Sequence, residues 1–389
     1  MKSAAIVGGG LAKFGRRRAT LRDLTSEAFK ALFNDIPNLS PSDVEALIVS
    51  SNAPERAGQT NLASVVAELV ELRNLKYVMR TEIACSSGHA AIRSAWFAIA
   101  SGFVDVALVI GVEKMWLPYP EAMLITDLER DWDFPHFWHG RAPSAFALCA
   151  VEHMRKYGTK REQLALVSVK NHGYARLNPY AQELRQRPSS VEDVLKSRPV
   201  SSPLNLFDCS SRVDGAAAVL LTSVERARDF TDSPIYLLGS GQTSIGLSLS
   251  SMGSFAEWPA LREAAAQAYR MAGVEPKDID YAELHDCFTI SEIIEYEELG
   301  FCPKGEGGKF IEEGQSYVGG RVAVNTRGGL IGCGHPVGAT GVAQAIEAMH
   351  QLRGSAEGRQ VKDCRVALIH TLGGAATTHS VLILGGEPR

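Results

Sequence analysis

The sequence predicts an α/β fold built from two similar halves. Apolar runs of about five residues alternate with helical stretches along most of the chain, a pattern typical of sheets that helices cover on both faces. The second half of the chain also echoes the first. With 389 residues, 45% of them hydrophobic, the chain can bury a large core and is long for one compact domain.

The internal repeat rests on segments that recur in the same order, at an offset that grows from roughly 230 to 260 residues. We interpret them as one duplicated strand–helix unit, with halves at 1–232 and 233–389. The matching pairs are Ala5–Gly10 with Tyr236–Gly241, Ser40–Ile48 with Glu275–Glu283, Cys85–Gly88 with His335–Gly338, and Val106–Ile110 with Val366–His370.

Helices are expected at Leu21–Asn34, Leu62–Leu72, Ala90–Ser101, Trp258–Ala272 and Val342–Leu352. The region from about 117 to 202 breaks the alternation, because it is rich in proline, aromatic and charged residues. We interpret it as an insertion in the first half, with a helix over Ser144–Tyr157. The aromatic stretch from Trp116 to Trp138 is expected to form a pocket wall or a subunit contact. A strand over Ala216–Leu221 then closes the first half.

Composition excludes several classes of protein. A net charge of -4 argues against a nucleic-acid binder, and no apolar run reaches membrane-spanning length. The seven cysteines are scattered, which indicates free thiols in a reducing compartment. The first residues are too short in apolar length for a signal peptide, and the last four carry no peroxisomal or retention signal. We therefore expect a cytoplasmic protein.

Cys85 is the first candidate for chemistry. It follows the strand-like Tyr77–Ile83 and precedes Gly88–Ser101, a predicted helix crowded with small residues. A thiol at a helix start faces unpaired backbone N–H groups and the positive end of the helix dipole, and both favour the reactive thiolate. The alternative is a buried structural cysteine, since free cysteine is among the most buried residue types.

His285 and Cys287 form the second candidate. They follow the strand-like Ile279–Leu284, and in a strand alternate side chains share a face. The two would then project together, with Asp286 and Phe288 turned away. An imidazole and a thiol on one face can polarise a carbonyl and move a proton. Zinc ligation is the alternative, but no second Cys/His pair has ligand-like spacing.

The third candidate is the glycine-rich stretch Arg327–Gly341, which contains His335. Pro336 suits a first helical turn, so His335 is expected at a helix mouth, as the repeat counterpart of Cys85. A Cys–His pair is the usual device for activating a thiol. A phosphate-loop reading fails because the Gly-Lys-Ser/Thr ending is absent. Cys333 is either a third reactive thiol or, as we favour, structural.

Three further segments of the sequence show weaker patterns that could indicate other roles. Gly8–Lys13 follows a strand but lacks the third glycine of a dinucleotide site. His136 and His139 invite a metal assignment, but their aromatic neighbours favour a pocket wall or contact. The segment Asn205–Ala218, which includes Arg212–Ala218, is expected to be structural and not catalytic.

The three candidate segments, in this order, resemble the thiolase superfamily. The match is to the branch with a His-Asp-Cys-Phe element, which includes SCP2-type and archaeal thiolases. The resemblance covers essentially the whole chain. It implies a five-layer α-β-α-β-α fold from two duplicated halves, with a loop domain of about 117–202 inserted in the first.

The resemblance also assigns roles. Cys85 corresponds to the nucleophile and His335 to the base that activates it, while His285 helps bind a thioester oxygen and Cys287 is the acid/base. Backbone N–H groups of Cys85 and Gly373 are expected to hold the oxyanion. The loop after His370 has no cysteine, where many thiolases carry their acid/base thiol. That departure is expected for the branch in which Cys287 takes the role.

The activity that the resemblance implies is Claisen condensation, or the reverse thiolysis, of acyl-CoA thioesters through a cysteine acyl-enzyme. No metal or redox cofactor is expected, with coenzyme A as a substrate. A homodimer or tetramer is expected, and a small zinc-ribbon/OB-fold protein is a plausible separate partner. Two alternatives stay open: another condensing acyltransferase of this fold with a non-CoA acceptor, and a scaffolding subunit active only within a multi-protein complex.

Overall fold

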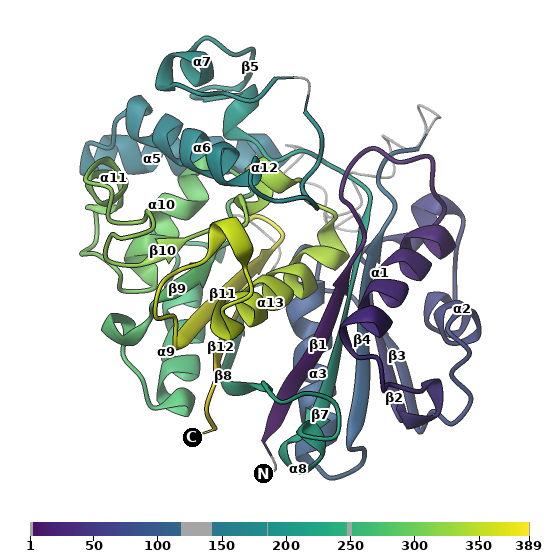
Figure 1. Ribbon diagram of the computed structural model, residues 1–389. Helices are drawn as coiled ribbons and strands as arrows, with labels where there is room; N and C mark the ends of the chain where they lie inside the picture. The colour runs from purple at the N-terminus through teal and green to yellow at the C-terminus, as the bar shows by residue number, and fades with distance from the viewer. Residues whose placement is uncertain (1–2, 118–141, 185, 247–250, 389) are drawn as a thin grey trace.

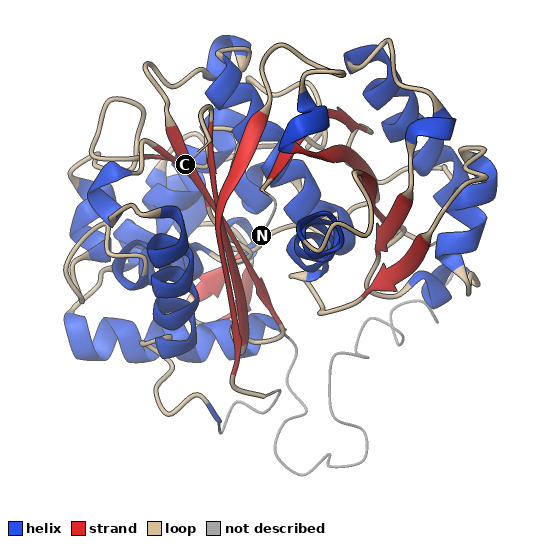
Figure 2. Cartoon of the chain, turned by 90° about the horizontal axis from the view of Figure 1, so that it is seen from below, coloured by secondary structure: helices blue, strands red, loops and turns tan. Residues whose placement is uncertain are grey.

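The structure is a computed structural model that describes residues 3–117, 142–184, 186–246 and 251–388. A mixed sheet of ten strands runs through the molecule, and helices cover both of its faces (Figures 1 and 2). Its strands are β1 (Ala4–Leu11), β2 (Ala46–Ser50), β3 (Tyr77–Thr81), β4 (Val106–Glu113), β7 (Gly215–Ser223), β8 (Ile235–Ser244), β9 (Tyr281–Glu283), β10 (Ala323–Val324), β11 (Val366–Gly373) and β12 (Thr378–Gly385).

Each helix predicted above corresponds to one of the longer described helices. They are α1 (Leu21–Asp35), α2 (Leu62–Leu69), α3 (Ser87–Ala100), α5 (Ala142–Tyr157), α6 (Arg161–Ala175), α9 (Pro259–Ala272), α10 (Thr289–Glu298) and α13 (Val337–Arg353). Shorter helices are α7 (Val191–Leu195), α8 (Val224–Ala227), α11 (Gly307–Glu312) and α12 (Gly329–Cys333). Within the described ranges, no helix has both the length and the apolarity needed to cross a membrane.

Strand order confirms the two duplicated halves. The sheet runs β10-β9-β11-β12-β8-β1-β7-β4-β2-β3, so each half repeats one order outward from the β1/β8 junction. Strand directions repeat as well, with two antiparallel pairings followed by two parallel ones in each half. At the junction, Ala5 pairs with Tyr236 and Ile6 with Ile235, in antiparallel register. The boundary at residue 232 stays a prediction.

Helices α3 and α13 form the central layer. They pack on each other; α13 also contacts β4 and β7 of the first half and β11 of the second, while α3 contacts β2, β4 and β12. Outer helices α1 and α2 cover the first half, and α9 covers the second (Figure 1). The two central helices cross closely, because a Cβ on Gly88 would lie 2.9 Å from Gly341 Cα. Glycines at both positions are therefore needed for the contact.

Local sequence explains where several helices begin and end. Thr20 caps α1, where its Oγ1 accepts the Asp23 N–H at 3.1 Å and the Asp23 carboxylate accepts the Thr20 N–H. Helices α9 and α13 end at Gly273 (φ +63°) and Gly354 (φ +72°), left-handed positions that favour glycine.

The glycines of β1 let the sheet pack closely against helices. A Cβ on Gly10 would lie 2.2 Å from the Leu32 backbone nitrogen of α1. In the repeat strand β8, a Cβ on Gly241 would lie 1.9 Å from the Ala264 oxygen of α9. Both halves thus use glycine to bring an outer helix against the sheet.

The insertion between β4 and β7 carries α5, α6, α7 and a small hairpin of β5 (Pro199–Ser201) and β6 (Leu204–Asn205). Helix α6 packs on α10, α11 and α12, so the insertion lies over the second half (Figure 1). Helix α5 confirms the helix predicted at Ser144–Tyr157. Most of the aromatic stretch, with His136 and His139, falls in 118–141, outside the described residues.

Candidate active site

Cys85 lies in the sharp turn that joins β3 to α3. Ala84 has φ +44°, a left-handed conformation that costs energy for a residue with a side chain. Ser87 holds the turn, because its Oγ donates to the Ala84 oxygen at 2.6 Å and accepts the Ile83 N–H at 2.8 Å. The turn presents the half-buried Cys85 two residues before a 14-residue helix, as predicted.

The second half of the chain touches this turn from the side. Ser86 Oγ lies 2.8 Å from Thr371 Oγ1 of β11. A Cβ on Gly373 would lie 2.8 Å from the Ile83 oxygen, so the end of β11 abuts the Cys85 turn. Gly373 therefore lies beside the nucleophile's loop, while its role in an oxyanion hole stays a prediction.

His335 stands at the mouth of α13, two residues before the helix begins. Its backbone N–H donates to the Ser211 oxygen at 2.9 Å, and its Nδ1 lies 2.8 Å from Thr340 Oγ1. Nε2 is buried without a hydrogen-bond partner among the described residues. When Nδ1–H donates to Thr340, Nε2 is left bare and can act as a base. Burial, with help from Arg212 and Arg327, lowers the pKa of His335 to about 3, so the ring is neutral.

His285 follows β9, but in a different geometry from the one predicted. The strand ends at Glu283, and the Cys287 N–H donates to the His285 oxygen at 2.8 Å. This bond closes a three-residue turn, so the strand geometry predicted for His285 and Cys287 is wrong, while a common face for their side chains stays a prediction. Asp286 does turn away, since its carboxylate accepts the N–H of Leu330 at 2.6 Å, at the start of α12.

Three of the four predicted side chains meet. The Cys85 sulfur and ring nitrogens of His285 and His335 all lie within 4.8 Å of one another. The two rings stand edge to face, with centroids 5.0 Å apart. Both ring nitrogens of His285 are buried without a partner among the described residues. Because such nitrogens are costly to bury, they indicate a site that binds a polar atom, such as a carbonyl oxygen.

The same three atoms would also suit a zinc ion, since thiolate and imidazole are its usual ligands. That no metal takes part stays a prediction.

Cys287 does not belong to that cluster of three. Its Sγ lies 3.7 Å from Ser291 Oγ of α10, and the side chain is 6% exposed. Burial raises the pKa of Cys287 well above its usual range, because the thiolate would lose its hydration. The residue is therefore a thiol in the free protein.

One short segment ties the loops of Cys287 and His335 together. The Ser210 N–H donates to the Cys287 oxygen at 2.9 Å, and the Ser211 oxygen accepts the His335 N–H at 2.9 Å. Adjacent residues thus hold both loops in place. Both serines lie within Asn205–Ala218, the segment expected from the sequence to be structural.

Buried carboxylates anchor the site's helices. Glu113, at the end of β4, accepts the N–H of Gly338 at 3.0 Å and of Asn52 at 2.8 Å, and so fixes the start of α13. Asp214 accepts the N–H groups of Met115 and Trp116 at 2.8 and 2.7 Å, in keeping with its predicted structural place. Sequence reasoning missed Glu113, because a single acidic residue after an apolar run carries no distinctive pattern.

Cys333 is part of the packing beneath this site. It is fully buried, and its Sγ donates to the Arg327 oxygen at 2.8 Å. These contacts fit the structural reading that the sequence favoured.

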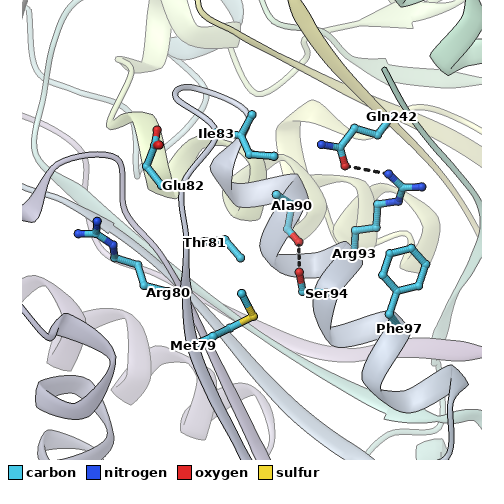
Figure 3. A pocket seen from close by; sticks show the side chains of 10 residues that line it. All are labelled: Met79, Arg80, Thr81, Glu82, Ile83, Ala90, Arg93, Ser94, Phe97 and Gln242. Carbon is cyan, nitrogen blue, oxygen red and sulfur yellow. Dashed lines mark hydrogen bonds between the residues drawn. The ribbon is translucent and has the colours of Figure 1, made fainter. Parts of the chain in front are cut away.

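An open cavity of about 330 Å³ lies between β3 and α3 (Figure 3). Ile83, two residues before Cys85, lines it, together with Arg93, which donates to Gln242 Oε1 at 2.8 Å. None of Cys85, His285 and His335 lines this cavity. It therefore borders the nucleophile's turn from outside and is not the reaction site.

The low pKa of His335 gives a testable pH profile. Since its pKa is about 3, the ring keeps its basic form at all pH values well above that. The value of kcat/KM for transfer of an acyl group to Cys85 should thus change little between roughly pH 5 and pH 8. Stopped-flow acylation, with circular dichroism as a folding control, measures it. A fall with an apparent pKa near 6.5 would contradict the assignment.

Known protein families match both halves of the chain. Residues 4–225 match the family described as "Thiolase, N-terminal domain", and residues 241–386 match "Thiolase C-terminal domain-like". The acetyl-CoA acetyltransferase of Methanothermobacter thermautotrophicus is 39% identical over 386 residues, which cover 98% of this chain and 99% of that one. The "Benzoylsuccinyl-CoA thiolase subunit BbsB" of Thauera aromatica is 36% identical, covering 95% and 94%.

Among solved structures, the "Ltp2-ChsH2(DUF35) aldolase" superposes with a TM-score of 0.85 at 28% identity. It covers 100% of this chain and 99% of that one. Sequence and structural neighbours thus agree on one fold over the whole chain.

Proposed function

Because this chain belongs to the thiolase family and is an acyltransferase that acts on acyl-CoA thioesters, we propose that two thiols and two imidazoles carry its reaction. The observation that supports the proposal most is the meeting of Cys85 Sγ with ring nitrogens of His285 and His335 within 4.8 Å. Three loops, far apart in sequence, place these atoms together.

In the first step His335 takes the proton of Cys85, and the thiolate attacks the carbonyl carbon of an acyl-CoA. The oxyanion is held by backbone N–H groups of Cys85 and Gly373. The intermediate collapses to a thioester on Cys85, and CoA leaves as a thiolate that takes a proton from Cys287. The acyl-enzyme then faces an imidazolium on His335 and a thiolate on Cys287.

In the second step acetyl-CoA binds, and the Cys287 thiolate removes a proton from its α-carbon. His285 and the His335 imidazolium stabilise the enolate oxygen, where charge develops. The α-carbon attacks the acyl group, a 3-ketoacyl-CoA leaves, and Cys85 regains its proton from His335. All side chains return to their starting states, so the cycle balances without a metal or redox cofactor. The same residues run the reverse thiolysis.

The direct test is CoA-dependent loss of acetoacetyl-CoA absorbance with the native protein. Turnover supports a short-chain thiolase like the archaeal relative. A folded protein that turns over neither acetoacetyl-CoA nor longer 3-ketoacyl-CoAs, alone or with a partner, would contradict the proposal.

The second candidate is a catalytic subunit that works only within a complex. It is supported by the similar structure, whose name pairs Ltp2 with a DUF35 protein, and by the relative named as a subunit. The predicted zinc-ribbon/OB-fold partner fits this candidate. Activity that depends on a protein co-purified from the native host would favour it, whereas full activity of the isolated chain would contradict it.

A homodimer through β3 is the oligomer that we propose. β3 ends the sheet, pairs only with β2 among the described strands and leaves Val78 41% exposed, while Phe97 of α3 is 47% exposed beside it. An unpaired apolar edge strand readily pairs with a second copy. Light scattering should therefore give a dimer for the native protein and a monomer for Val78→Lys. Val318→Lys, at a position 46% exposed elsewhere, is the matched control and should stay dimeric. A native monomer would contradict the assignment.

A reducing, cytoplasmic location also fits the proposal. None of the seven cysteines forms a disulfide, and the proposed chemistry needs two of them as thiols.

A further inference from the structure

Behind His285 lies a chain of buried polar groups that the proposed reaction does not use. Glu295 of α10, His370 of β11 and His379 of β12 are all fully buried. Glu295 Oε2 accepts the His285 backbone N–H at 3.0 Å, and Glu295 Oε1 lies 3.5 Å from His370 Nδ1. His370 Nε2 lies 3.1 Å from His379 Nδ1, and His379 Nε2 lies 2.9 Å from the Ala376 oxygen.

The last hydrogen bond in this row of buried polar groups determines which ring nitrogens carry a proton. A carbonyl oxygen can only accept, so His379 Nε2 carries a proton and donates it to Ala376. Burial lowers the pKa of His379 well below its usual value and that of His370 to about 3, so both rings are neutral. His379 Nδ1 is then bare and accepts from His370 Nε2–H. His370 therefore turns a bare Nδ1 toward Glu295.

One more proton is required between Glu295 and His370. His370 Nδ1 and Glu295 Oε1 have no other hydrogen-bond partner among the described residues. Two buried acceptors facing each other repel unless a proton joins them. Burial, and then the neighbouring Glu292, raises the pKa of Glu295 well above its usual range, so the proton belongs on the carboxyl. A proton on Glu295 would lie between its Oε1 and the bare Nδ1 of His370, which are 3.5 Å apart.

The charge of Glu295 matters to the second thiol. An ionised Glu295 would raise the pKa of Cys287 further. The groups that face this region are Glu292 of α10, Asp286 and Cys287 of the preceding loop, Lys170 of α6, His89 of α3, His370 of β11 and His379 of β12. Lys170 is already paired with Glu292 Oε1 at 2.7 Å. Within the described part of the chain, a charged Glu295 would therefore lack a cation of its own.

We propose that Glu295 is a positioning residue that, as a neutral acid shared with His370, anchors the main chain of His285 and keeps negative charge away from Cys287. This role rests on the proposed function, since it serves the step in which Cys287 takes a proton. It explains why an acid sits fully buried beside two neutral imidazoles.

Two variants of Glu295 separate the role from simple packing. Glu295→Gln keeps both bonds, because its amide oxygen accepts from His285 and its amide nitrogen donates to His370. Glu295→Leu removes both hydrogen bonds but has a side chain of similar volume. We expect Glu295→Gln to keep kcat within about twofold, and Glu295→Leu to lose roughly tenfold or more in kcat with little change in KM. Acetylation of Cys85 should remain in both variants.

A second readout does not need turnover. In a Cys85→Ser background, alkylation of Cys287 by iodoacetamide at pH 7 is followed by peptide mass spectrometry. If Glu295 is neutral, Glu295→Gln leaves this rate within about twofold; if it is charged, the substitution speeds alkylation severalfold. A severalfold rise, or a folded Glu295→Leu variant with native kcat, would overturn the proposal. Loss of Cys85 acetylation in the native protein would instead overturn the proposed function, which the alkylation rate does not depend on.

Discussion

Replacing Cys85 by serine is expected to lower kcat for acetoacetyl-CoA thiolysis by roughly 10⁴-fold or more. Every later step starts from the thioester on this residue, and a serine hydroxyl at the same place is a far weaker nucleophile than a thiolate. Serine also keeps the volume and polarity of the turn, so the fold should be unchanged. The CoA-dependent loss of acetoacetyl-CoA absorbance measures the effect, with thermal unfolding as a check on stability.

A matched control is Cys364→Ser, which changes another half-buried cysteine outside the cluster of three. It should keep native activity. Comparable activity in Cys85→Ser and Cys364→Ser would place the nucleophile elsewhere in the chain.

Replacing Cys287 by alanine should separate the two half-reactions. Acyl transfer to Cys85 needs only the nucleophile and His335, because the thiolate of CoA is a fair leaving group even without a proton donor. Carbon–carbon bond formation needs a base at the α-carbon, so condensation and thiolysis should fall by roughly 10²- to 10⁴-fold. Single-turnover acylation and steady-state thiolysis, measured on the same preparation, check this.

Cys149→Ala is the matched control for that variant, since Cys149 is likewise buried, at 2% exposure, and lies in α5. Both substitutions leave a small cavity, so equal losses of activity would trace the effect to stability. If Cys287→Ala lost acylation and condensation to the same extent while Cys149→Ala kept both, the separate roles assigned to Cys85 and Cys287 would be contradicted.

Much of the fold was readable because the chain repeats itself. The paired runs predicted at Val106–Ile110 and Val366–His370 became β4 and β11, equivalent strands of the two halves. Both are buried along their whole length, which explains why they appear as continuous apolar runs without alternation. The helix starts beside Cys85 and His335 could also be predicted from the repeat. Small residues and glycines mark both of them, because α3 and α13 cross there.

The side-chain geometry of the site was harder to predict from the sequence. The strand geometry predicted for His285 and Cys287 failed because a backbone hydrogen bond closes a turn there, and the loop is held by a distant residue, Ser210. Thr340 and Glu295 were missed because their function depends on pairing across the fold. A threonine in the first turns of a helix, or a glutamate in an acidic helix, has no local signature. Partners that meet only after folding leave no periodic pattern in the sequence.

The central claim, that Cys85 carries the acyl group and Cys287 does not, is tested most directly by intact-mass measurement after brief exposure to acetyl-CoA. We expect the native protein and Cys287→Ala to gain the mass of one acetyl group, with the modified peptide containing Cys85, and Cys85→Ser to gain none. An acetyl group on Cys85→Ser, or its absence from folded native protein, would contradict the account.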